Sequence, residues 1–160
     1  MERERAEFAR FYGDNRDDCL RAITAAVGDA QVAEDLVADA FAKAWASWRT
    51  VARHPAPRAW LIRTMLNTRV SWWRRRHREV AFGDHDQIAP ARGQSGLDQT
   101  LLGILQQLPV RQREVVALRL VLDLDTEATA KALGIAEGTV KAHLSRAIST
   151  LRKHIVPADR

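Results

Sequence analysis

Residues 126–152, TEATAKALGIAEGTVKAHLSRAISTLR, constrain the fold more tightly than any other stretch of the chain. Ala130, Gly134 and Val140 have the spacing of a helix-turn-helix. A small alanine lets two helices approach, glycine permits the turn between them, and the β-branched valine packs the second helix on the first. We therefore expect a short helix before Gly134 and a longer helix that begins near Glu137.

The outward side of this second helix has the chemistry of a nucleic-acid contact. Hydroxyl, imidazole and cationic groups recur along it, and such groups bond phosphates and base edges. They are Thr139, Lys141, His143, Ser145 and Arg146. Thr129 departs from the apolar residue usual just before the alanine of such a motif. The net charge of +5 over 160 residues also favours a polyanionic partner.

Charge is distributed unevenly along the chain. Residues 51–78 carry eight arginines and no acidic residue, whereas residues 1–50 carry seven basic and ten acidic side chains. A protein that only coats DNA does not need an acidic first third, so we expect a second surface that does not bind DNA. Asp35, Asp39 and Lys43 lie off the apolar stripe of the second expected helix, where a plain solvated face is the alternative interpretation.

Apolar residues recur every three or four positions, which predicts helices over roughly 5–27 and 58–78. A further helix is expected between Asp29, as its N-cap, and Trp48, the last residue of its apolar stripe. Gly28 is expected to end the first helix. The two prolines of the sequence HPAP, at 54–57, are expected to end the helical pattern before the third helix begins.

Residues 79–96 lose this periodicity and collect glycine, proline and small polar residues, so we expect a linker there. The predicted fold class is all-α, with two small helical domains over residues 1–78 and 97–160 joined by a flexible linker. Such a linker permits packed and splayed arrangements of the two domains alike.

The third expected helix combines arginines with tryptophans, a pairing that suits single-stranded or opening DNA. Arginine neutralises phosphates, and an exposed indole stacks on an unpaired base with about 1–3 kcal/mol. Adjacent residues of a helix point about 100° apart. We therefore expect one of Trp72 and Trp73 in the core and the other partly exposed, and Trp60 in the core.

Other classes of function find little support. The single cysteine, Cys19, excludes an internal disulfide and a cysteine-based metal cage, and we expect it as a buried thiol. The spacing of the histidines is not that of metal ligands, and the sequence shows neither a nucleophile paired with a base nor a glycine-rich phosphate loop. It also shows no apolar run long enough to span a membrane and no signal-peptide core. We therefore expect a cytoplasmic protein that is not an enzyme, with no catalytic residue, cofactor, metal, membrane contact or small-molecule substrate.

Three segments in this order resemble a known family: AEDLVADAFAKAWASW at 33–48, PRAWLIRTMLNTRVSWWRRR at 57–76, and the helix-turn-helix at 126–152. The family is the bacterial RNA polymerase sigma factors of the extracytoplasmic-function (ECF) type, and the WRRR ending resembles an actinobacterial subgroup. The resemblance implies sigma domains 2 and 4, with core RNA polymerase and promoter DNA as partners. It also implies promoter-specific initiation of transcription. An anti-sigma protein is a further partner that occurs in the family.

The resemblance implies roles for individual residues. Asp35, Asp39 and Lys43 would bind core polymerase. The loop 49–57 and the third helix would open and hold the −10 promoter element, through Arg63, Asn67, Arg69, Trp72, Arg74, Arg75 and Arg76. The −35 element would be read by Thr139, Lys141, His143 and Arg146. His143 stands where many relatives have arginine.

Two other interpretations compete with this one. LPVRQREVVALRL followed by TVKAHL also resembles the DNA-binding domain of LuxR-type response regulators, but a receiver domain would give an α/β first half. The helical periodicity of the first half argues against it. A helical adaptor that only sequesters a protein is the other alternative, and binding to core polymerase separates it from a sigma factor.

Overall fold

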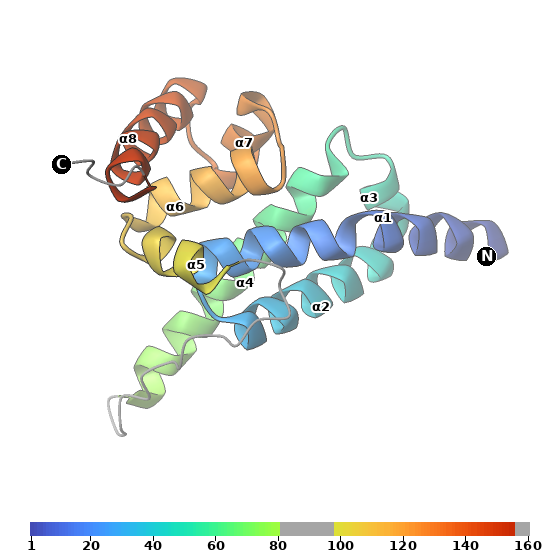
Figure 1. The fold of residues 1–160 in the computed structure, drawn as a ribbon. Coiled ribbons are helices and arrows are strands. Elements are labelled where there is room, and N and C mark those ends of the chain that lie inside the picture. The colour runs from blue at the N-terminus through green and yellow to red at the C-terminus, as the bar shows by residue number, and fades with distance from the viewer. Residues whose placement is uncertain (81–97, 156–160) are drawn as a thin grey trace.

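The computed structural model describes residues 1–80 and 98–155, and every regular element in these two ranges is helical. The first range forms α1 (Glu2–Val27), α2 (Ala30–Ala46), α3 (Trp48–Ala52) and α4 (Pro57–Val80). The second forms α5 (Gln99–Gln106), α6 (Val110–Val116), the π-helix η1 (Ala117–Val121), α7 (Thr126–Leu133) and α8 (Glu137–Ile155). The predicted all-α fold class is confirmed (Figure 1).

The boundary between α1 and α2 follows the local chemistry of the sequence. Gly28 ends α1 with φ at 82°, a left-handed conformation that glycine adopts without strain. The carboxylate of Asp29 then accepts hydrogen bonds from the backbone N–H groups of Gln31 and Val32, at 2.9 and 3.1 Å. Both predictions for this boundary, the glycine stop and the aspartate N-cap, are confirmed.

The second helix was expected to continue to Trp48, and this predicted end is wrong. Part of the expected loop 49–57 is also helical. Helix α2 ends at Ala46, and Trp48 begins the short helix α3. This break turns the indole of Trp48 into the core, where it is 8% exposed and its ring lies 5.3 Å from that of Phe11. Trp45 is 41% exposed and lies at the edge of the apolar face.

The two halves of the chain pack directly against each other. Helix α1 contacts α5, α6 and η1 of the second half, and α4 contacts α7 (Figure 1). A single apolar cluster joins Leu20 and Ile23 of α1 to Val115 and Leu118 of the second half. The sequence left packed and splayed arrangements open, and the structure has the packed one.

The predicted linker lies almost wholly outside the described residues, since α4 runs to Val80 and the description resumes at Asp98. The thiol of Cys19 is fully buried, as expected, and burial raises its pKa to about 12. Among the helices that the structure describes, none is both long and apolar enough to cross a membrane.

Candidate nucleic-acid interface

The helix-turn-helix has the geometry that its sequence predicts. Asp125 caps α7 by accepting a hydrogen bond from the backbone N–H of Ala128 at 2.7 Å. Gly134 takes a left-handed conformation with φ at 67°. Ala130 and Val140 are both buried and belong to the same apolar cluster. The motif is therefore formed as expected.

Helix α8 carries the four predicted −35 residues on two flanks. Thr139, His143 and Arg146 are spaced i, i+4, i+7 and share one side of the helix. Lys141 is about 200° around the axis from Thr139 and lies on the other flank. All are exposed except His143, which is half-buried and whose Nδ1 is buried without a hydrogen-bond partner. A helix inserted in a groove can contact DNA with both flanks.

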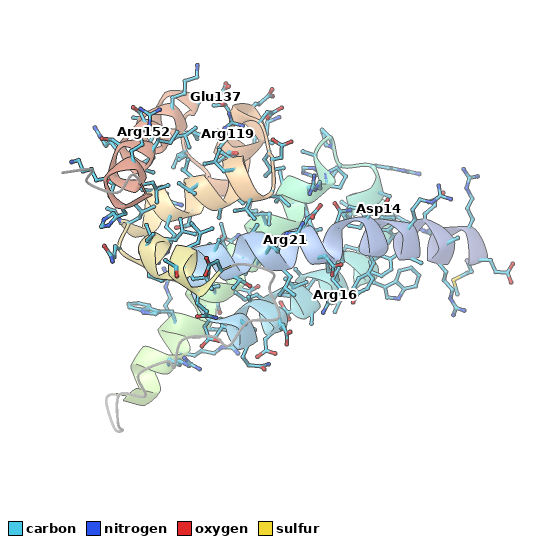
Figure 2. The ribbon with its side chains drawn as sticks, in the orientation of Figure 1. Asp14, Arg16, Arg21, Arg119, Glu137 and Arg152 are labelled. Atoms are coloured by element: carbon cyan, nitrogen blue, oxygen red, sulfur yellow. The ribbon has the colours of Figure 1, made fainter. Side chains whose placement is uncertain are left out.

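Charge along α8 matches the dipole of the helix. Glu137 lies in the first turn, where the backbone carries partial positive charge, and Arg152 lies in the last turn (Figure 2). Lys153 and His154 follow Arg152. The helix is therefore electrostatically favourable at both ends.

The seven predicted −10 residues do not form one surface on α4. Arg63, Asn67 and Arg74 are spaced i, i+4, i+11, share one face and are all exposed. They form an exposed stripe along the helix that combines two guanidinium groups with one amide. This stripe has the donors and acceptors needed for phosphates and for a base edge.

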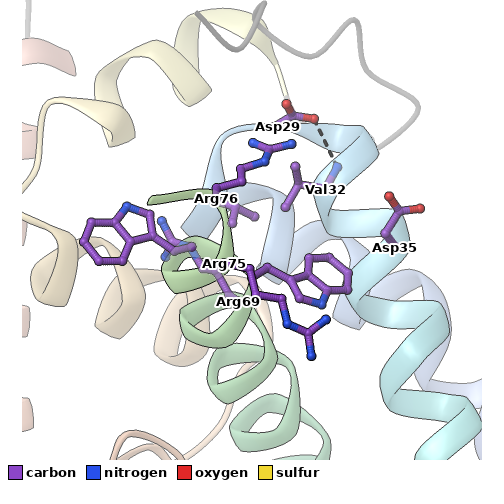
Figure 3. A pocket seen from close by; sticks show the side chains of 9 residues that line it. Asp29, Val32, Asp35, Arg69, Arg75 and Arg76 are labelled. Carbon is purple, nitrogen blue, oxygen red and sulfur yellow. Dashed lines mark hydrogen bonds between the residues drawn. The ribbon is translucent and has the colours of Figure 1, made fainter. Parts of the chain in front are cut away.

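The other four predicted −10 residues line a cavity of about 390 Å³ between α4 and the start of α2. Figure 3 shows Arg69, Arg75 and Arg76 on the α4 side of this cavity. Trp72, the fourth, is half-buried and packs on the apolar core. Asp29, Val32 and Asp35 lie on the opposite wall. The cavity is thus cationic and aromatic on one side and partly acidic on the other.

Trp73 is a candidate that the sequence reasoning missed. One tryptophan of the pair was expected to be exposed, and Trp73 is that residue, with 58% of its surface exposed. It also lines the cavity next to Trp72. Its place about 100° from Trp72, away from the apolar residues Leu61 and Met65, is the signal that could have identified it.

The predicted polymerase-binding residues lie on α2, and one of them, Asp35, also lines the cavity opposite the arginines of α4. Asp35 is exposed, and its Oδ1 accepts a hydrogen bond from Nε2 of Gln31 at 3.1 Å. Asp39 Oδ2 lies 2.9 Å from Nζ of Lys43. Ala38 and Ala42 are exposed beside these charged residues. Because alanine side chains are small, another helix can approach this face of α2 closely. The structure brings all three predicted residues to one side of α2.

A second cavity, of about 290 Å³, lies between α4 and the second half of the chain. Asn67 and Arg69 of α4 face Arg111 and Glu114 of α6 across it. Glu114 is 7% exposed, and burial raises the pKa of its carboxyl above the usual value, against the opposing effect of Arg111, Arg69 and Arg113. Two predicted −10 residues therefore border the second half of the chain.

Comparison with known proteins identifies both halves. Residues 11–79 match the family model of sigma-70 region 2, and residues 98–151 match that of sigma-70, region 4. The RNA polymerase sigma-E factor of Streptomyces coelicolor is 36% identical over 96% of this chain and 88% of its own length. The ECF RNA polymerase sigma factor SigL of Mycobacterium tuberculosis is 34% identical over 78% of this chain and 75% of its own.

A solved structure agrees with these relatives. The sigma factor RpoE in complex with the anti-sigma factor NepR from Bartonella quintana superposes with a TM-score of 0.76 and 30% identity. The match covers 96% of this chain and 99% of that one, so it includes both halves and their placement. The chain therefore belongs to the sigma-70 family of bacterial RNA polymerase sigma factors, and within it to the ECF type.

Proposed function

We propose that this ECF sigma factor divides promoter selection among three of its surfaces. The outer side of α2, with Asp35, Asp39 and Lys43, docks on core RNA polymerase. Helix α4 holds the −10 element, and α8 reads the −35 element in the major groove. What supports this division is that Asp35 and Asp39 lie on one helix, α2, whereas exposed cationic side chains lie on α4 and α8.

The mechanism follows from differential binding. Contact of α8 with duplex DNA anchors the protein, and the arginines and indoles of α4 then bind unpaired bases more tightly than paired ones. Because the melted state gains more binding free energy than the closed duplex, strand opening becomes favourable. The chain itself makes and breaks no covalent bond, and it acts in the cytoplasm, where its polymerase and promoters are.

The domain boundaries proposed from the sequence are 1–78 for the docking and −10 domain and 97–160 for the −35 domain, with a linker over 79–96. The two family models, over 11–79 and 98–151, support these limits. An anti-sigma protein is a further proposed partner, supported by the likeness to RpoE in its complex with NepR.

The acidic face of α2 carries the proposal and can be tested directly. Asp35→Ala with Asp39→Ala should weaken binding to actinobacterial core polymerase at least tenfold, because two carboxylates are removed from the proposed interface. Asp14→Ala with Asp17→Ala is the matched control, since these exposed acids lie on α1 and the change in charge is equal. Core affinity is measured with fluorescently labelled protein. Equal affinity for both double variants would contradict docking through α2.

A further inference from the structure

One face of α4 brings guanidinium groups and indole rings together at the cavity that it shares with the start of α2. Arg69, Trp72, Trp73 and Arg76 line this cavity and are spaced i, i+3, i+4, i+7, so they share one side of the helix. Arg75 lines its edge. Along α4, two indoles thus lie between two cations. The cavity volume of about 390 Å³ is in the range that holds a small organic ligand.

The cations of this wall are available to an anionic ligand. Within the described residues, neither Arg75 nor Arg76 forms an ion pair or a hydrogen bond. Asp29 on the facing wall already uses its Oδ1 to accept the backbone N–H groups of Gln31 and Val32. Guanidinium groups bind phosphate oxygens through charge-assisted, often bidentate hydrogen bonds. The α4 side of the cavity therefore suits a phosphate.

The inner part of the cavity suits a planar ring. Trp72 is half-buried and packs on the apolar core, and Val27 and Val32, which also line the cavity, pack on the same core. An indole stacks favourably on a nucleobase, and aliphatic side chains cover the rest of such a ring without competing for its polar edge. A flat aromatic ligand thus finds apolar surface beside the cations that would hold its phosphate.

The wall opposite the arginines offers a carboxylate (Figure 3). Oδ1 of Asp35 accepts a hydrogen bond from Gln31, and among the described residues its Oδ2 accepts none. A carboxylate only accepts hydrogen bonds, so it selects a base edge that carries donors. Guanine presents two adjacent donors, N1–H and the N2 amino group, whereas adenine presents an acceptor nitrogen in place of N1–H. The cavity therefore combines sites for both ends of a guanine nucleotide.

The same acidic wall favours a free nucleotide over a continuous strand. A strand would carry further phosphates past Asp29 and Asp35, where like charges repel. A single nucleotide places its phosphate on one wall and its base donors on the other.

These observations carry an inference beyond the proposed function, because it requires neither polymerase nor promoter. We propose that the cavity between α4 and the start of α2 binds a free guanine nucleotide. Its phosphate lies on Arg75 and Arg76, its base stacks on Trp72, and its N1–H and N2 amino groups donate to Asp35.

Calorimetric titration of the full chain with guanosine monophosphate (GMP) and adenosine monophosphate (AMP) tests the base contact. GMP should bind one to one, and AMP at least tenfold more weakly, because adenine cannot donate twice to a carboxylate. Asp35→Asn should weaken GMP binding at least fivefold and reduce the preference over AMP. Asp39→Asn is the matched control, since it removes the same charge from the same helix but does not line the cavity. It should leave both affinities unchanged.

The phosphate contact is tested with a second pair of variants. Arg76→Ala should weaken GMP binding at least fivefold. Arg74→Ala should not, because Arg74 lies about 160° around α4 from Arg76 and does not line the cavity. Guanosine, which has no phosphate, should bind wild type and Arg76→Ala with equal affinity. A loss of guanosine binding in Arg76→Ala would assign Arg76 a structural effect and overturn its contact with phosphate.

Two results would overturn the site as a whole. Equal affinity for GMP and AMP, or no binding of GMP at millimolar concentration, would contradict recognition of free guanine nucleotides. In the second case, a single-stranded oligothymidylate with one central guanosine is titrated as well. Binding of that strand without binding of GMP would assign the cavity to promoter DNA. These titrations contain no polymerase, so a failure of the proposed function in transcription leaves their outcome unchanged.

Discussion

Nζ of Lys43 on α2 donates a hydrogen bond to Oγ1 of Thr68 on α4, at 3.1 Å, while pairing with Oδ2 of Asp39 at 2.9 Å. Thr68 is 8% exposed, and its hydroxyl donates in turn to Asp39 at 3.4 Å. The contact joins the proposed docking helix to the proposed −10 helix. It also holds Asp39 and Lys43 in place, which would lower the entropic cost of the proposed docking.

Thr68→Val keeps the shape of the side chain and removes both hydrogen bonds. We expect a loss of about 1 kcal/mol in the free energy of unfolding. Core affinity should fall roughly threefold, because Asp39 and Lys43 are no longer ordered in advance. Thr64→Val is the matched control, since the Thr64 hydroxyl donates only to Trp60 O of its own helix, at 2.9 Å. Urea unfolding and core-binding titrations measure both effects, and equal core affinities for the two variants would contradict pre-ordering.

Thr129 stands where the helix-turn-helix usually has an apolar residue, and its fully buried hydroxyl has no hydrogen-bond partner. Thr129→Val should therefore raise the free energy of unfolding by about 1–2 kcal/mol, because no polar group is then left unsatisfied. Thr24→Val should not stabilise the protein, because the equally buried Thr24 hydroxyl donates to Leu20 O at 2.7 Å. Thermal and urea unfolding of the pair decides the point; a stabilised Thr24 variant would count against the explanation.

Glu114 should make stability depend on pH in a defined direction. Burial raises the pKa of its carboxyl in the folded protein, so the folded state binds a proton more tightly than the unfolded state does. The stability that this provides is complete below the unfolded pKa and is lost as pH rises through the folded pKa. Glu114→Gln should thus be more stable than wild type at pH 8, with an advantage that shrinks as pH falls towards 4.5.

Urea unfolding of both proteins across this range measures that difference. Glu127→Gln, at an exposed glutamate of α7, is the control for the loss of one charge. A Glu114→Gln advantage that grows towards acid pH would contradict the sign worked out above.

Replacing Arg74, Arg75 and Arg76 by alanine together should weaken promoter complexes and flatten their salt dependence. Each arginine that no longer neutralises a phosphate of a single strand reduces the slope of log affinity against log salt by about 0.7, so the slope of the triple variant should fall by up to about 2. The control removes three exposed arginines of α1, Arg3, Arg5 and Arg10. Filter binding or anisotropy at several salt concentrations gives the slopes. An unchanged slope in the first variant would remove these arginines from the DNA interface.

Local chemistry made much of the fold predictable. Gly28 and Gly134 mark helix ends, and Asp29 marks a helix start, because backbone conformation and capping depend on near neighbours. The short α3 was missed, since five residues are too few for a periodic pattern. The packing of the two halves against each other could not be predicted from the sequence either. The Arg113 to Ala26 bond joins residues 87 positions apart, and no local pattern specifies such a contact.

The residue types of the candidate site could be predicted from the sequence, but the surface on which each residue lies was harder to predict. Arginines and tryptophans of α4 were identified from composition, but the 100° step of a helix separates Arg63, Asn67 and Arg74 from Arg69 and its neighbours. Which indole is exposed depended on the direction of the core, so Trp73 was missed as a candidate. Asp35, Asp39 and Lys43 were easier, because a spacing of four places them on one side.

Run-off transcription tests the central claim most directly. Purified actinobacterial core polymerase is incubated with a pooled library of genomic promoter fragments, with and without this protein. We predict transcripts that require the protein and whose start sites share two upstream elements, near −10 and −35. The same transcripts from core polymerase alone, or no transcript at all in the presence of stably bound protein, would contradict the claim that this chain supplies promoter recognition.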